Sequence, residues 1–164
     1  MFLTACVPAT DAGAAWPLKL ASSTESKVTV DISIERAATG GFVLAATFTP
    51  AAGFHLYSKD LPRGGVDGLG CPTLLELVAG TRLEAAGELT ESVSAMQAEG
   101  PDGLWIYPAG PVTLRLAVAL PAGSGWFDDQ VAVTYMACSG SICSPPVIAK
   151  PVSLRVPGAK EVEP

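Results

Sequence analysis

The chain has 164 residues, of which 49% are hydrophobic and 16% charged, with 17 glycines, 14 prolines and a net charge of −6. This length predicts one domain with its own core, and the acidic balance argues against binding nucleic acid or anionic lipid through a basic surface. No apolar run in the sequence approaches the roughly 20 residues that a membrane-spanning helix needs.

The first residues contain a short motif with two interpretations. Leu3-Thr4-Ala5-Cys6 has the pattern of a bacterial lipobox, in which the cysteine becomes a lipid-modified N-terminus. A signal peptide needs a basic segment and an apolar segment of about 7–15 residues, but only five residues precede Cys6. Either the true start lies upstream, or the match is a coincidence. A truncated lipoprotein signal is favoured, and residues 1–26 are expected to be a signal remnant and a tether.

A two-residue alternation begins at Lys27 and predicts the first strand. Residues 27–35 place four β-branched side chains on one face and polar side chains on the other, as a half-buried strand requires. A Gly-Gly turn and residues 42–49 complete a predicted hairpin. A short strand at 54–58 and a loop rich in Gly and Pro follow. The next strand candidates are residues 73–78 and 81–89.

The second half of the chain continues this pattern. Residues 92–103 are irregular and long enough to be a functional loop. Further strands are predicted at 104–108, 112–120, 130–138 and 147–156, with the domain spanning 27–157 and a frayed tail at 158–164. Eight or nine short strands separated by turns predict an all-β sandwich.

Two cysteines, Cys138 and Cys143, lie close together after the strand at 130–138. A structural disulfide here would close a loop of only six residues and contribute about 2 kcal/mol in the chain-entropy model. A zinc site would need a second ligand pair, and the remaining candidates are Cys6, Cys71 and a single histidine, His55. A copper site with Met136 or Met96 has no ligand spacing to support it.

A redox disulfide fits more of the local sequence. Alternation along 130–138 places Val131, Val133 and Tyr135 on the core face, so Cys138 is expected on the thinner, more open side. The Ser-Gly-Ser segment between the cysteines can turn freely, and two prolines stiffen the returning chain. No Lys, Arg or His lies between Gln130 and Ala149 to lower a thiol pKa. The absence of a nearby basic residue favours a domain whose disulfide is attacked by the thiolate of a partner. It argues against a thioredoxin-like domain whose own thiolate attacks other disulfides.

Three segments together resemble a known family, the N-terminal periplasmic domain of the thiol:disulfide interchange protein DsbD and its stand-alone relatives. These segments are GFHLYS at 53–58, CPTLLEL at 71–77 and VTYMACSGSICSPP at 133–146. The last is the most specific, since it resembles the family signature of a Val-Thr-Tyr strand, two cysteines around a short loop, and a Pro-Pro. The resemblance spans roughly residues 28 to 156.

The resemblance implies an immunoglobulin-like β-sandwich in an extracytoplasmic, periplasmic compartment. The lipobox pattern adds, separately, the expectation of a lipid anchor at Cys6. Cys138 and Cys143 would be the redox pair, with no cofactor, and Cys143 is favoured as the sulfur that links to a partner. Electrons would come from a separate thioredoxin-like or membrane-embedded protein and pass to periplasmic disulfide proteins. Residues 95–105 would correspond to the family's capping loop, which makes Glu99 and Asp102 candidate acidic neighbours.

Other interpretations of these residues stay open at the sequence level. The domain could be a non-catalytic immunoglobulin-like binding or adhesion module with an inert hairpin disulfide, or a copper-binding periplasmic protein. Cys71 has no place in the family's redox chemistry and is expected to be a small buried or loop thiol. His55 is expected to be a packed ring and Tyr135 a core residue, while Glu99 and Asp102 can each be read as a solvated loop charge.

Overall fold

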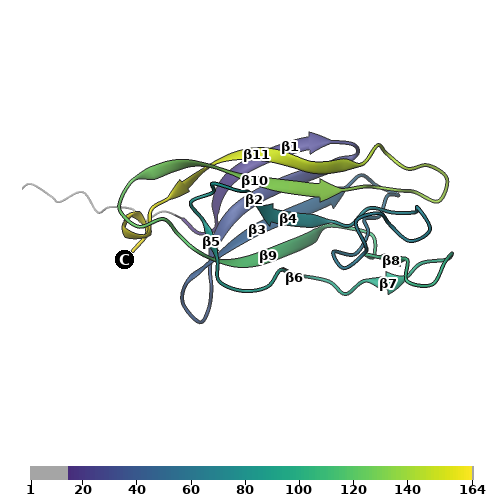
Figure 1. Ribbon diagram of the computed structural model, residues 1–164, viewed down its shortest axis with the longest axis horizontal. Helices are drawn as coiled ribbons and strands as arrows, with labels where there is room; N and C mark the ends of the chain where they lie inside the picture. Colours follow the sequence, from purple (N-terminus) through teal and green to yellow (C-terminus); the bar gives the residue numbers. More distant parts are fainter. Residues whose placement is uncertain (1–14, 164) are drawn as a thin grey trace, which may run out of the picture.

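The computed structural model describes residues 15–163 as two antiparallel sheets packed face to face (Figure 1). The larger sheet has the order β1-β2-β3-β9-β5, with β6 also paired to β9, and the smaller sheet has the order β11-β10-β4. Two further short strands, β7 and β8, form a separate hairpin. The strands are β1 (Leu18–Glu25), β2 (Val28–Arg36), β3 (Phe42–Pro50), β4 (Leu74–Leu77), β5 (Glu84–Ala85), β6 (Thr90–Glu91), β7 (Met96–Gln97), β8 (Trp105–Ile106), β9 (Val112–Ala119), β10 (Trp126–Tyr135) and β11 (Val147–Pro157).

The core lies between the two sheets and follows the sequence alternation. Every second residue of β2, from Val28 to Ile34, is buried, and β9 repeats the pattern from Val112 to Val118. Tyr135 of β10 closes the core from the other sheet and is 1% exposed, as expected. The all-β, immunoglobulin-like sandwich predicted from the sequence is therefore confirmed, and so is the hairpin of β2 and β3.

The N-terminal boundary of the sandwich differs from the prediction. Residues 18–25, which were expected to belong to a tether, form β1 and pair with β2. This strand is at the edge of its sheet and only half-buried, and its second half, from Ala21 onward, contains mainly small and polar residues. A period-two pattern needs large apolar side chains on one face, so this edge strand leaves a weak signal in the sequence.

The C-terminal segment also differs from the frayed tail that the sequence suggested. Residues Ala159–Glu161 form a short 3₁₀ helix, and Val162 is buried. The backbone carbonyl of Val162 accepts a hydrogen bond from the Arg36 guanidinium. The segment is held by these contacts, which involve residues more than a hundred positions away and are invisible in local sequence.

The loops at one end of the sandwich contain the cysteine pair. The hairpin after β10, the segment between β3 and β4, and the β7–β8 hairpin gather at the end opposite the C-terminus (Figure 1). A groove of about 680 Å³ lies along the first half of β10, lined in part by Gly80, Asp129 and Arg155, and includes neither cysteine. In the described part of the chain, no helix is long and apolar enough to cross a membrane.

Candidate redox site

Cys138 and Cys143 form a disulfide across a tight hairpin, with their Cα atoms 4.0 Å apart. Two backbone hydrogen bonds flank the pair: Ser144 N donates to Ala137 O at 2.8 Å, and Ser139 N donates to Ile142 O at 2.7 Å. The cysteines therefore occupy a non-hydrogen-bonded position between two hydrogen-bonded ones, where opposing side chains approach most closely. The backbone alone brings the two sulfurs together.

The turn that joins the cysteines is held by a serine side chain. Ser139 Oγ accepts a hydrogen bond from Ile142 N at 3.2 Å and from Ser141 N at 3.4 Å. The Ser139 side chain thus satisfies backbone donors that would otherwise depend on water. The turn is a defined structure rather than a free loop, so its position relative to the disulfide is set by the protein.

The two cysteines differ sharply in their exposure to solvent. Cys138 is 2% exposed, whereas Cys143 is exposed, as are its neighbours Ile142 and Pro145. The expectation that Cys138 lies on an open side of the sheet is therefore wrong. Its side chain does lie on the face opposite Tyr135, but loops from elsewhere in the chain cover that face.

A small second core, which we call the cap cluster, covers Cys138. It consists of Cys138 with Tyr57, Leu61 and Leu104, and partly buried residues pack around it: Val66, Ala98, Ile106 and Met136. Leu61 and Val66 come from the long loop between β3 and β4, and Leu104 comes from the β7–β8 hairpin. Burial of Cys138 therefore depends on two segments distant in sequence.

The segment at 54–58 runs beside Cys138 through backbone bridges rather than as a regular strand. His55 N donates to Cys138 O at 2.8 Å, and Cys138 N donates to His55 O at 3.1 Å. The His55 ring is half-buried and lies edge-on to the Tyr57 ring, with centroids 5.5 Å apart. Burial lowers the pKa of His55 and raises the pKa of Tyr57. The sequence interpretation of His55 as a packed ring missed its position next to the pair.

The predicted capping stretch is the β7–β8 hairpin, and it contributes Leu104 to the cap cluster. The carboxylates of Glu99 and Asp102 are both exposed, and neither makes a hydrogen bond or ion pair within the described residues. Their predicted role as acidic neighbours of the pair stays a prediction. The tip of the hairpin is held instead by Gln97, whose Oε1 accepts a hydrogen bond from Gly103 N at 3.0 Å.

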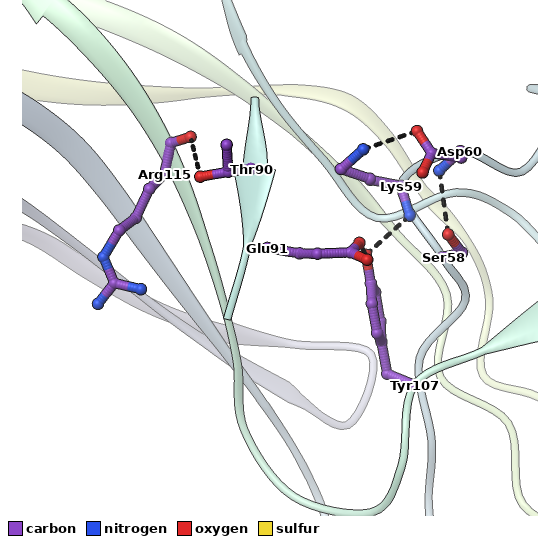
Figure 2. Close-up of polar contacts among 7 residues, drawn as sticks. All are labelled: Ser58, Lys59, Asp60, Thr90, Glu91, Tyr107 and Arg115. Carbon is purple, nitrogen blue, oxygen red and sulfur yellow. Dashed lines mark hydrogen bonds and ion pairs between the residues drawn. The ribbon is translucent and has the colours of Figure 1, made fainter. Parts of the chain in front are cut away.

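The base of this hairpin is closed by a tyrosine that sequence reasoning did not single out. The Tyr107 hydroxyl donates a hydrogen bond to Glu91 Oε2 and accepts one from Lys59 N at 2.9 Å (Figure 2). Tyr107 is fully buried, and its burial together with the Glu91 carboxylate strongly raises its pKa. The hydroxyl links the two ends of the hairpin segment to the segment after Tyr57.

Of the other two cysteines, only Cys71 lies within the described residues. It is a buried free thiol, as the sequence suggested, and burial raises its pKa despite the opposing effect of Arg63. Cys6, the candidate lipidation site, lies outside the described residues.

The two methionines considered as copper ligands lie in different surroundings in the fold. Among residues 15–163, no group of three or more His, Cys, Asp or Glu side chains is placed to hold a metal ion. Met96 is half exposed on the β7–β8 hairpin, while Met136 packs against the cap cluster. The disulfide joins one exposed cysteine, Cys143, to one buried cysteine, Cys138.

Comparison with known proteins gives one structural similarity. No protein-family model matches the chain, and no curated protein matches it significantly. The structure is similar to the crystal structure of the N-terminal domain of Neisseria meningitidis DsbD in its reduced form, with a TM-score of 0.47 and 15% sequence identity. The similarity covers 80% of this chain and 86% of that chain.

Proposed function

We propose that the protein is an extracytoplasmic thiol:disulfide interchange module in which the Cys138–Cys143 disulfide relays electrons. The donor is a thioredoxin-like or membrane-embedded redox protein, and the acceptors are disulfide-containing proteins of the same compartment. The observation that carries the proposal is the asymmetry of the pair, with Cys143 exposed on a hairpin and Cys138 2% exposed beneath the cap cluster. Disulfides persist in oxidising compartments, which supports an extracytoplasmic location.

This asymmetry defines the order of the exchange steps. A donor thiolate attacks Cys143 Sγ, a donor–Cys143 mixed disulfide forms, and the electron pair of the broken bond goes to Cys138 Sγ. The donor's second thiolate then attacks the donor's first sulfur, which is bonded to Cys143 Sγ in the mixed disulfide. This step closes the donor's disulfide and releases Cys143 as a thiolate. Two electrons and two protons pass from the donor dithiol to the pair, and the reverse sequence reduces an acceptor disulfide.

Two further features support this function. The closed loop is short, so the disulfide contributes only about 2 kcal/mol to stability in the chain-entropy model, while the sandwich has an extensive core of its own. The surface around Cys143 includes Ile142, which is 63% exposed, and the exposed Pro145 and Pro146. Exposed apolar side chains beside a reactive sulfur suit contact with a partner protein.

A second function is favoured by one observation. Cys138 is 2% exposed, and a buried cysteine is also typical of a structural disulfide. This observation favours a non-catalytic binding module whose disulfide is inert. The two functions differ in the reduction potential of the pair, because structural disulfides typically have potentials below about −300 mV.

The test combines this potential with trapping of a partner. In a Cys6→Ser background, thiol trapping and mass spectrometry across a graded redox buffer give the reduction potential of the pair. The Cys138→Ser variant keeps Cys143 and is expected to accumulate a mixed disulfide with a thioredoxin-like protein. The matched Cys143→Ser variant, which keeps only the shielded thiol, is expected to accumulate far less. A pair that stays oxidised throughout, or equal trapping by both variants, would contradict the relay function.

A further inference from the structure

His55 is the cross-strand neighbour of Cys138. Their two backbone hydrogen bonds, at 2.8 and 3.1 Å, define a hydrogen-bonded antiparallel pair. In such a pair the two side chains lie on the same face of the sheet, with Cβ atoms about 4.5–5.5 Å apart. Cys143 is the antiparallel neighbour of Cys138 on its other side. Across this local sheet the order is therefore His55, Cys138, Cys143.

The packing around His55 places its ring on the same face independently. Its ring contacts the Tyr57 ring edge-on, and Tyr57 and Cys138 both belong to the cap cluster. Along the same segment Leu56 faces the other way, into the main core. The alternation of the segment and the pairing with Cys138 agree, so the His55 side chain lies on the same face as the Cys138 side chain, whose sulfur leaves when Cys143 is attacked.

We infer, on the basis of the proposed function, that His55 exchanges a proton with Cys138 during disulfide exchange. In the reducing direction the Sγ–Sγ bond breaks, the electron pair goes to Cys138 Sγ, and the His55 imidazolium delivers its proton to that sulfur. In the oxidising direction the neutral imidazole takes the proton back from the Cys138 thiol, and the resulting thiolate attacks Cys143 Sγ in the mixed disulfide. The proton balance closes because the donor dithiol releases the protons that the pair gains.

The environment of His55 favours the neutral form of its ring. The His55 residue is half-buried, and burial lowers its pKa, which favours the neutral imidazole that takes a proton in the oxidising direction. The Tyr57 hydroxyl stays neutral because burial raises its pKa. The charged groups on the segments at this end of the sandwich are Glu25, Lys27, Lys59, Asp60, Arg63, Asp67, Glu76, Glu91, Glu99, Asp102 and Lys150. None of these contributes to the shift in the His55 pKa.

The experiment uses the fact that the chain has a single histidine. Reduction of the oxidised protein by dithiothreitol is followed between about pH 5 and 8.5, where histidine changes its charge, and each rate constant is divided by the thiolate fraction of dithiothreitol. The pKa of His55 is measured separately on the oxidised protein by NMR of the imidazole signals. The corrected rate constant is expected to rise about tenfold as pH falls through that pKa, because protonation of the leaving sulfur speeds its departure.

Variants separate His55 from other groups. His55→Gln keeps a polar side chain without a titrating ring, and its corrected rate constant is expected not to change with pH. Glu84→Gln and Glu88→Gln, which change exposed carboxylates on β5 and the segment after it, serve as controls that leave the inflection in place. If His55→Gln does not fold, coincidence of the wild-type inflection with the NMR pKa still decides the matter.

The outcomes also separate this inference from the proposed function. A pair that exchanges at a corrected rate independent of pH, or an inflection away from the NMR pKa or retained in His55→Gln, would overturn the role of His55 alone. A pair that dithiothreitol does not reduce at any pH would overturn both.

Discussion

The hydroxyl of Tyr107 donates a hydrogen bond to the carboxylate of Glu91, and this contact joins the two ends of the segment that carries Leu104 over Cys138 (Figure 2). The same hydroxyl accepts a hydrogen bond from Lys59 N, in the segment that follows Tyr57. The Tyr107 hydroxyl oxygen therefore connects the two segments that cover Cys138, which are the β7–β8 hairpin and the loop between β3 and β4. The shielding of Cys138 depends on a polar contact as well as on apolar packing.

Loss of this hydroxyl is expected to destabilise the protein and loosen the hairpin. Tyr107→Phe leaves the Lys59 N–H and the Glu91 carboxylate without their partner, which costs about 1–3 kcal/mol in the free energy of unfolding. Urea denaturation measures this loss, and hydrogen exchange of the Ala98 amide reports the hairpin itself. Tyr135→Phe is the matched control, because its hydroxyl makes only a 3.5 Å contact with Glu25 O. Equal losses in the two variants would contradict the special role of Tyr107.

Stability is expected to fall in alkaline solution. The chain has three tyrosines, Tyr57, Tyr107 and Tyr135, and burial raises the pKa of each. The unfolded state loses these protons near pH 10 while the folded state keeps them, so the contribution is complete below about pH 10 and declines as pH rises further. Absorbance of tyrosinate near 295 nm and urea denaturation at increasing pH test this. Tyrosines that titrate in the folded protein as they do in the unfolded chain would refute it.

Truncation of Leu104, the β7–β8 hairpin residue that packs in the cap cluster, is expected to expose Cys138 to solvent. Leu104→Ala leaves a cavity in the cap cluster and lowers the free energy of unfolding by about 2–3 kcal/mol. In the reduced protein, alkylation of Cys138 is expected to become several-fold faster, as read by peptide mass spectrometry. Met96→Ala, on the same hairpin but half exposed, is expected to change stability by less than about 0.5 kcal/mol and to leave Cys138 protected.

The disulfide itself is expected to matter little for folding. Cys138→Ser combined with Cys143→Ser removes a crosslink over a sequence separation of five residues, and the predicted loss is about 2 kcal/mol. Thermal and urea denaturation of the oxidised wild type and this variant give the difference. Complete unfolding of the variant would indicate that the hairpin disulfide is structural.

Native cysteine reactivity is expected to follow burial. Cys71 is 5% exposed and its pKa is raised, so it should resist a thiol reagent in the folded protein and react once the chain is unfolded in urea. After mild reduction, Cys143 should react well before Cys138. In a Cys6→Ser background, every labelled thiol belongs to Cys71, Cys138 or Cys143. Rapid labelling of Cys71 in the native state would show that the residues covering it move aside readily.

The sequence by itself determined β2, β3, β9 and the second half of β10, together with the location of the cysteine pair, but it did not reveal the edge strand β1. The alternation in β2 and β9 survives in the fold because each of these strands buries one face and exposes the other, so the pattern depends on the strand alone. The hairpin of β2 and β3 was readable for the same reason, because its turn is local. The pairing of Cys138 with Cys143 is also local, since a tight turn separates them.

Only the tertiary structure decided which sulfur is shielded and what lies beside it. Local alternation correctly placed Cys138 and Tyr135 on opposite faces of the strand. The residues that cover Cys138 include Tyr57 and Leu104, which are distant in sequence. The pairing of His55 with Cys138 depends on the same long-range packing. A periodic pattern records which face of a strand a side chain occupies, whereas burial of that face depends on which other segments fold over it.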